Sequence, residues 1–148
     1  MGTIFTAATA YLGEQDLELS IDGDDTASFA VEAGSTPWRV HVWAHEEVQQ
    51  LLVHSVCPFG IPEQRMVEMA LFLTRANFGM SIGNFELDVE TGELRYKTSI
   101  DTNGQELNAE WLRPLFLANI STMDRYLPGI LAVVGGVDAA TAITAVES

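Results

Sequence analysis

One stretch decides the fold: NFGMSIGNFELDVETGELRYKTSI, residues 77–100. From Asn84 onward, apolar and charged residues alternate on both sides of the pair formed by Thr91 and Gly92. Side chains along a β-strand point alternately to its two faces, so each half of the stretch predicts a half-buried strand. Together with the short turn between them, the two halves predict a β-hairpin.

The register of this hairpin follows from its turn. A two-residue turn at Thr91 and Gly92 sets apolar partners opposite one another on one face and opposite charges on the other. The apolar pairs are Val89 with Leu94, Leu87 with Tyr96 and Phe85 with Thr98. The charged pairs are Asp88 with Arg95 and Glu86 with Lys97. A slip of one residue would place charges against apolar side chains, so pattern and turn predict the same register.

The chain is strongly acidic. It has 148 residues, of which 21 are Asp or Glu and 7 are Lys or Arg, for a formal net charge of −14. Residues 1–38 hold seven acidic residues and no Lys or Arg. Binding of phosphates needs clustered cations, so this charge argues against nucleic acid and against anionic membranes as partners. It favours solubility, or a partner with basic segments.

Length and composition predict one domain. A chain of this length, with 47% hydrophobic residues, can bury about 68–70% of the surface of its unfolded form. We expect a single domain over residues 1–148 with an ordered core at about 3–136. Residues 137–148 are rich in Ala and Thr with little apolar pattern, which predicts a frayed C-terminal tail.

Cysteine use and hydropathy indicate the compartment. Cys57 is the one cysteine, which excludes an intrachain disulfide and a cysteine-based zinc site. A lone thiol fits a reducing compartment. No apolar run has the length of a membrane-spanning helix, and the first residues lack the basic region of a secretion signal. We therefore expect a cytoplasmic protein with no membrane partner.

The N-terminal half predicts a helix and then a meander of strands. Ile4, Ala8 and Leu12 share one side of a helix over residues 3–13. Residues 17–21 fit either a short strand or an extended lead-in. Alternating patterns predict three further strands joined by short connections, at residues 28–33, 38–45 and 48–57.

Two more helices are expected in the C-terminal half. The first covers residues 62–77, with Pro62 as its first residue. Its core stripe consists of Met66, Met69, Ala70, Leu73 and Ala76. The last helix begins at Asn108, or near Pro114 because proline is poor inside a helix, and ends at Gly135.

The resulting order of elements is α-βββ-α-ββ-α, an α+β fold. We predict one antiparallel five-stranded sheet with the helices packed on one face, because their apolar stripes must be buried. The sequence contains no internal repeat and no linker.

The sequence offers no set of residues suited to catalysis or to metal binding. His41 and His45 share one face of a predicted strand, but four residues along a strand span about 13 Å, too far for one zinc ion. Ser55 and Cys57 lie near His54, yet neither is in a turn that would expose it as a nucleophile. We therefore expect no enzyme, no bound metal and no cofactor.

Two segments of the sequence contain recognisable motifs. The first combines an Asn that ends a helix, a Gly-x-Phe strand and an acidic-Gly turn, and the second is an Asp-x-Tyr-x-Pro motif in the last helix. The residues involved are Asn77, Gly83, Phe85, Leu87, Gly92, Tyr96, Asp124, Tyr126 and Pro128. On these motifs the chain resembles the YbjN-like family of bacterial sensory transduction regulators. Its order of elements is also similar to the small acidic chaperones of type III secretion.

The resemblance implies structural motifs and no defined reaction. Our leading expectation is a non-enzymatic, cytoplasmic protein-interaction module, a regulator or chaperone-like protein that binds a partner polypeptide. One alternative is a small-ligand sensor with a pocket between sheet and helices. A hydrolase is a further alternative, and it would need a carboxylate or His with a strongly perturbed pKa in a cleft.

A homodimer is expected through the helix at residues 62–77. Leu71 and Phe72 fall outside its core stripe and should point outward, with Arg65 and Glu68 as a polar rim. Twofold symmetry would place two copies of this helix against each other. The resemblance implies the same, since the secretion chaperones act as dimers.

Overall fold

A computed structural model describes residues 2–34 and 36–148 of the chain. At its centre is one antiparallel sheet of six strands in the order β1-β2-β3-β4-β6-β5. The strands are β1 (Ser20–Ile21), β2 (Thr26–Val31), β3 (Trp38–His45), β4 (Gln50–Val56), β5 (Asn84–Leu87) and β6 (Leu94–Asp101). The helices are α1 (Thr3–Gly13), α2 (Met66–Asn77), α3 (Ala109–Val134) and α4 (Ala139–Glu147), with short 3-10 turns η1 (Glu46–Val48) and η2 (Glu63–Arg65).

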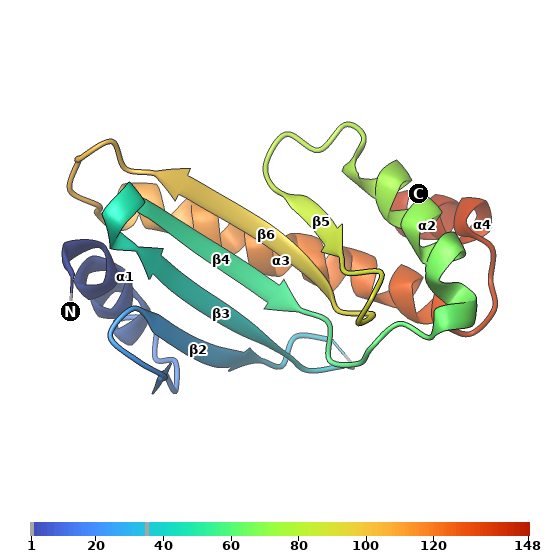
Figure 1. The fold of residues 1–148 in the computed structure, drawn as a ribbon, viewed down its shortest axis with the longest axis horizontal. Helices are drawn as coiled ribbons and strands as arrows, with labels where there is room; N and C mark the ends of the chain where they lie inside the picture. The colour runs from blue at the N-terminus through green and yellow to red at the C-terminus, as the bar shows by residue number, and fades with distance from the viewer. Residues whose placement is uncertain (1, 35) are drawn as a thin grey trace.

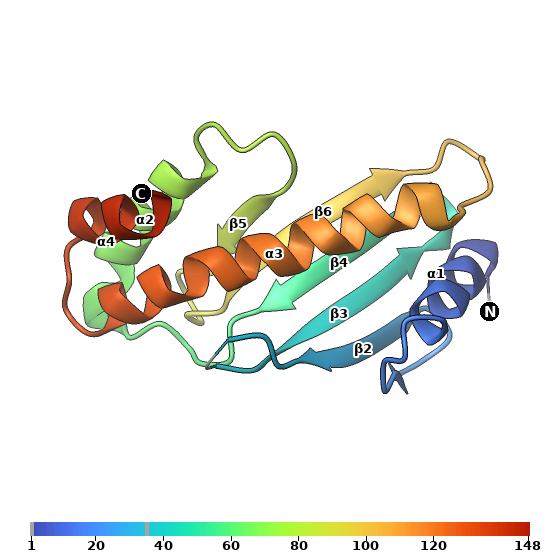
Figure 2. The same cartoon turned by 180° about the vertical axis from the view of Figure 1, so that it is seen from behind.

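The helices leave one face of the sheet uncovered. Helix α3 runs along the other face, behind the strands in Figure 1 and in front of them in Figure 2. At one end α1 packs beside α3, where the rings of Tyr11 and Phe116 stack at 5.8 Å between centroids. At the other end α2 and α4 lie side by side next to β5. We call the side bearing α3 the closed face and the opposite side the open face.

The core fills the space between α3 and the closed face. The strands contribute buried side chains of one alternation phase, including Phe29, Val40, Val42, Leu51, Val53, Leu94 and Tyr96. The helix contributes a stripe at spacings of three and four residues, including Leu112, Phe116, Met123, Leu127 and Ile130. Burial of these two surfaces against each other is the main stabilising term of such a fold.

Helix α3 starts at the earlier of the two predicted positions. The Asn108 side chain accepts hydrogen bonds from the backbone N–H groups of Glu110 (3.0 Å) and Trp111 (3.3 Å). This cap holds the first turn, so the helix continues through Pro114 and ends before Gly135 as expected. Packing of the long apolar stripe outweighs the loss of a helical hydrogen bond at each proline.

The predicted two-residue turn in the hairpin is wrong. The loop covers residues 88–93, and Leu87 faces Leu94 while Phe85 faces Tyr96. The Asp88 carboxylate accepts the N–H of Glu90 at 2.9 Å, which draws residue 88 into the turn and shortens the strands. The register moves by two residues, an even number, so the predicted faces are preserved.

Two further expectations are corrected. The sheet has six strands instead of five, because residues 20–21 pair with β2 as a short edge strand. Residues 139–147 form a helix instead of a frayed tail, with Ala139, Ala142 and Ile143 buried. The Asp138 side chain caps this helix by accepting the N–H of Thr141 at 2.9 Å.

Candidate partner-binding surfaces

Phe72, which the sequence pattern placed on an outward-facing dimer surface, is completely buried. Its ring meets that of Tyr126 edge to face at 6.4 Å between centroids. Gly129 of α3 makes room for it, since a methyl group at that position would lie 2.6 Å from the Phe72 ring. The outward orientation expected for Phe72 is therefore wrong, because α2 is covered on two sides and not on one.

Arg65 and Glu68, expected as the polar rim of that surface, instead hold the C-terminal part of the chain. Arg65 donates to the backbone carbonyls of Val133 (2.7 Å) and Val137 (2.9 Å) at the end of α3. The Glu68 carboxylate accepts the N–H of Ala139 at 2.8 Å, at the start of α4. A cation at a helix C-terminus and an anion at a helix N-terminus are both favourable. The chain itself thus occupies the position expected for a partner.

A different side of α2 is exposed and apolar. The exposed fractions are 75% for Val67, 50% for Leu71 and 91% for Phe78, which directly follows the helix. Residues spaced by four and seven positions lie on one side of a helix, so we group these three as the α2 stripe. The exposed Thr74 and Arg75 lie between Leu71 and Phe78. Of the four predicted interface residues, only Leu71 belongs to it.

An open groove continues the α2 stripe at its C-terminal end. It lies between the loop of residues 78–83 and α3, and its walls include Phe78, Ile82, Thr122 and Arg125. Ile82 is 53% exposed, so the groove presents an apolar rim with polar groups from α3 beside it. A concave surface of this kind can hold one side chain of a peptide or a small molecule.

The residues of the family motif organise the edge of the sheet beside this groove. Asn77 ends α2, and its side chain accepts the Phe85 N–H at 2.7 Å and donates to the Phe85 carbonyl at 3.2 Å. These two bonds imitate a neighbouring strand at the outer edge of β5, which protects that edge from further pairing. The hydroxyl of Tyr96 donates to the carbonyl of Ile82 and fixes the preceding loop.

Both motif glycines have left-handed backbone conformations and close neighbours. Gly83 has φ +73°, and a methyl group there would lie 2.6 Å from the Lys97 carbonyl oxygen. Gly92 has φ +82°, and a methyl group there would lie 2.6 Å from the Ile61 carbonyl oxygen. Glycine alone meets both requirements without strain.

The Asp-x-Tyr-x-Pro motif lies in α3. The Tyr126 hydroxyl donates to the Glu147 carboxylate at 2.6 Å and so ties α4 to α3. Burial and this bond raise the pKa of Tyr126 to about 12. Pro128 lies within α3, Asp124 lies near Gly34, and Leu87 is half-buried beside the core. Of these residues, Tyr126 has a structural role through its bond to α4.

The groups that chemistry could use are not arranged for it. Burial raises the pKa of the Cys57 thiol to about 11, so at neutral pH it stays protonated and is a poor nucleophile. Within residues 2–34 and 36–148, no three His, Cys, Asp or Glu side chains are grouped so as to hold a metal ion. In that same part of the chain, no helix is long and apolar enough to cross a membrane.

Comparison with known proteins places the chain in a family. The sequence pattern of the YbjN family, described as "Putative bacterial sensory transduction regulator", matches residues 9–132. No curated protein matches the chain in sequence. Among solved structures, a chain from "Structure of the HopA1-SchA Chaperone-Effector Complex" is similar in fold, with a TM-score of 0.50 and 16% identity. The match covers 81% of this chain and 88% of that one.

These findings confirm the resemblance drawn from the sequence motifs, and they confirm a chaperone-like α+β fold. The family is described as one of regulators, the similar structure is that of a chaperone–effector complex, and neither description names a reaction. Because the pattern matches far more than half of its residues, this chain belongs to the YbjN family of sensory transduction regulators.

Proposed function

We propose that this chain is a non-enzymatic, cytoplasmic protein-interaction module, a regulator or chaperone-like protein that binds a partner polypeptide through the α2 stripe. The observation that carries the proposal is the exposure of Phe78, 91%, next to the exposed Val67 and Leu71. Single exposed apolar residues are common on protein surfaces, but three on one side of a helix, one of them an almost fully exposed phenylalanine, are typical of a partner site.

The chemistry of the stripe fits a helix or an apolar strand of another chain. Its length, from residue 67 to residue 78, corresponds to three turns of helix, about 16 Å. An aromatic residue beside a groove is the usual anchor of such contacts, because it buries much area at a low cost in side-chain entropy. The fold of a chain from a chaperone–effector complex supports the same class of function.

A second copy of this chain is one partner that the stripe suits. Twofold symmetry would place α2 of one protomer against α2 of its partner, with the stripe of each buried. The homodimer expected from the sequence is therefore kept as a proposal, with Val67, Leu71 and Phe78 in place of Phe72.

Sedimentation of a double variant tests this proposal. Leu71→Glu/Phe78→Glu places charges at two of the three residues of the stripe, and Leu117→Glu, at an exposed apolar residue of α3, is the control. At a protein concentration of roughly tens of micromolar, we expect wild type and control to sediment as dimers. The double variant should sediment as a monomer. A monomeric wild type would remove the dimer.

A photo-crosslinking residue at position 71, compared with one at position 117, tests for other partners in the native cytoplasm. Mass spectrometry should recover a distinct polypeptide from position 71 alone. Equal products from both positions would contradict a partner site on α2.

The second candidate function, a small-ligand sensor, is favoured by the groove between the 78–83 loop and α3. Polar side chains, including Thr122 and Arg125, line it beside apolar walls. A ligand would raise the melting temperature of the purified protein, whereas a peptide partner alone would leave a small-molecule library without effect.

A further inference from the structure

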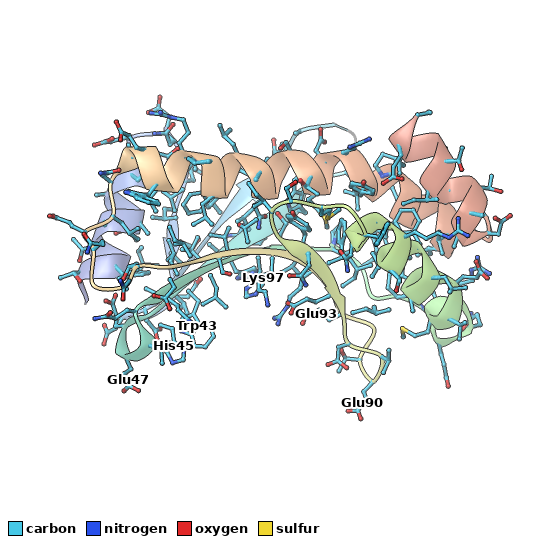
Figure 3. All side chains as sticks on the ribbon, turned by 90° about the horizontal axis from the view of Figure 1, so that it is seen from above. Trp43, His45, Glu47, Glu90, Glu93 and Lys97 are labelled. Carbon is cyan, nitrogen blue, oxygen red and sulfur yellow. The ribbon has the colours of Figure 1, made fainter. Side chains whose placement is uncertain are left out.

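Helix α4 fills a groove between two other helices. It packs against both α2 and α3 at one end of the molecule, away from Trp43 and His45 of the open face (Figure 3). A methyl group at Gly129 of α3 would lie 2.6 Å from the Phe72 ring of α2 and 2.9 Å from Cγ1 of Val146. The three helices therefore meet at Gly129, where the missing side chain lets a helix approach closely.

The groove holds both ends of the helix that lies in it. At the N-terminal end, the Glu68 carboxylate accepts the N–H of Ala139 at 2.8 Å. At the C-terminal end, Arg125 donates to the carbonyl of Val146 at 3.3 Å. An anion at the start of a helix and a cation at its end favour one direction of the helix between them. Both contacts are to backbone atoms, so they suit any helix of this length that lies in the same direction.

The side of α4 that faces the groove consists of small residues. Ala139, Ala142 and Ile143 are buried, and Val146 is partly buried beside them. Their spacing of three, one and three positions places all four on one side of a helix. Apolar stabilisation scales with the area removed from water. Two alanines and one isoleucine therefore hold α4 less firmly than the long stripe of α3 holds that helix.

Three further features favour release of α4 from the groove. A helix of nine residues is not stable by itself in water, so the structure of α4 depends on its contacts with the groove. Gly136, in the connection to α3, has φ +109° and open space where a side chain would be, which suits a hinge. The family pattern ends at residue 132, so it includes the groove but not α4.

We propose that this groove is a docking site for an amphipathic helix of a partner polypeptide, and that α4 occupies it as an intramolecular competitor. The partner helix has small apolar residues at the spacing of Ala139, Ala142, Ile143 and Val146, and it lies in the direction of α4. Because α4 must leave first, the apparent affinity for the partner is reduced by the fraction of molecules in which the groove is free. The groove is on a different side of α2 from the α2 stripe, and the proposal does not rest on the stripe.

Hydrogen exchange of the wild-type protein tests whether α4 opens by itself. The protection factors of the amides at residues 142–146 should be at least about a hundredfold lower than those at residues 120–126 of α3, because local opening costs less than global unfolding. Low concentrations of urea should hardly change exchange in α4, since local opening exposes little surface. Equal protection of the two segments would overturn the proposal, because α4 would then open only with the whole domain.

A fluorescein-labelled peptide with the sequence of residues 138–148, DAATAITAVES, tests the groove. Ala142→Glu places a charge on the buried side of α4 and should release it, whereas Ala140→Glu places the same charge on the exposed side and is the matched control. Fluorescence anisotropy should show the peptide binding to Ala142→Glu with a Kd of roughly 100 μM or below. Wild type and Ala140→Glu should bind it at least about tenfold more weakly. A peptide that itself carries Ala142→Glu should bind to none of them.

Addition of Val67→Glu/Leu71→Glu to Ala142→Glu separates this site from the α2 stripe. Both positions are exposed on the stripe, so the combined variant should bind the peptide as Ala142→Glu does. Loss of the wild-type dimer in Val67→Glu/Leu71→Glu, with peptide binding retained in the combined variant, would show two independent surfaces. Failure of one proposed surface is therefore distinguishable from failure of the other.

Three results with these variants would overturn the inference. One is no binding of the peptide to Ala142→Glu at about 1 mM, or equal binding to Ala140→Glu. Another is loss of cooperative urea unfolding in Ala142→Glu, which would make α4 a part of the core. The third is a wild-type dimer that persists in Val67→Glu/Leu71→Glu and dissociates in Ala142→Glu, which would make α4 of a second copy the occupant of the groove.

Discussion

Asn119 and His54 are buried polar residues on opposite faces of the same sheet, and they differ in what satisfies them. Asn119 of α3 is fully buried on the closed face. Its amide donates to the carbonyl of Val53 (2.9 Å), the carbonyl of Tyr96 (3.3 Å) and the hydroxyl of Thr98 (3.1 Å). Its oxygen accepts from the Ser55 hydroxyl. The Nε2 of His54, one residue before Ser55, has no partner among the described residues.

The amide of Asn119 uses its hydrogen bonds to fix the fold, whereas the Nε2 atom of His54 keeps its hydrogen-bonding capacity unused among the described residues. The Asn119 network continues through Ser55 to the indole of Trp38 (3.0 Å), so the helix and three strands, β3, β4 and β6, are joined in one arrangement. A fully satisfied buried network favours a single packing of its elements. The open face has no such closure around His54, and the hydrogen-bonding capacity that it retains suits a ligand.

The largest effect should come from breaking the closed face. Asn119→Ala removes four hydrogen bonds, leaves the Ser55 O–H without its acceptor beneath α3 and creates a small cavity. We expect the free energy of unfolding to fall by about 3–4 kcal/mol, measured by urea denaturation. Ser121→Ala is the control, because its exposed hydroxyl donates to the Leu117 carbonyl within the same helix and takes no part in the network. A loss below about 1 kcal/mol for Asn119→Ala would contradict the role of the network.

The closed face was readable from the sequence, but its polar centre was not identified. Ser55 follows the alternation phase of Leu51 and Val53, and Asn119 lies three residues after Phe116 in the apolar stripe of the last helix. The available signal was a polar residue at a core-facing position of the strand and another at a core-facing position of the helix, two elements that must pack together. Their pairing depends on how the helix lies across the strands, which periodicity does not give.

At the end of the molecule where α2 and α4 lie, the sequence pattern did not predict which helices pack together. Asp138 three residues before Thr141 was an available capping signal for α4. Without α4, α2 was treated as a helix with one buried side, and Phe72 was assigned to the surface. The α+β class, the faces of the hairpin and the family were correct because each depends on local pattern alone. The side of α2 that remains free depends on a helix more than sixty residues later in the chain.

On the open face, we expect an effect of intermediate size, a dependence of the free energy of unfolding on pH through His54. The unfolded His54 binds a proton near pH 6.5, whereas the folded one stays neutral down to about pH 4. Between these values the unfolded state binds more protons, so stability falls as the pH is lowered through this window. From pH 7 to pH 5 we expect His54 to account for a loss of roughly 2 kcal/mol in the free energy of unfolding.

His54→Leu should remove that loss. At pH 7 the variant should be as stable as wild type to within about 0.5 kcal/mol, or more stable, since it replaces an unsatisfied buried group. Substitution of the exposed His41 by Leu is the matched control, and it should retain most of the pH dependence of the wild type. Parallel pH profiles for wild type and His54→Leu would show that His54 is not the group responsible.

The smallest effect on stability should come from Glu86, the one carboxylate that the open-face cations share. Burial acts to raise its pKa, but the hydrogen bonds from Lys97 and Arg95 outweigh this and hold the pKa below the usual 4.5. Its contribution to stability is therefore present above pH 4.5 and is lost as the pH falls through the folded pKa. Because these ion pairs lie at the surface, Glu86→Gln should cost no more than about 1 kcal/mol at pH 7.

Urea denaturation at pH 7 measures this loss. Glu106→Gln, which removes the same charge at an exposed residue away from the open face, is the control and should change the free energy of unfolding by less. A loss well above about 1 kcal/mol for Glu86→Gln would contradict the surface character of these ion pairs.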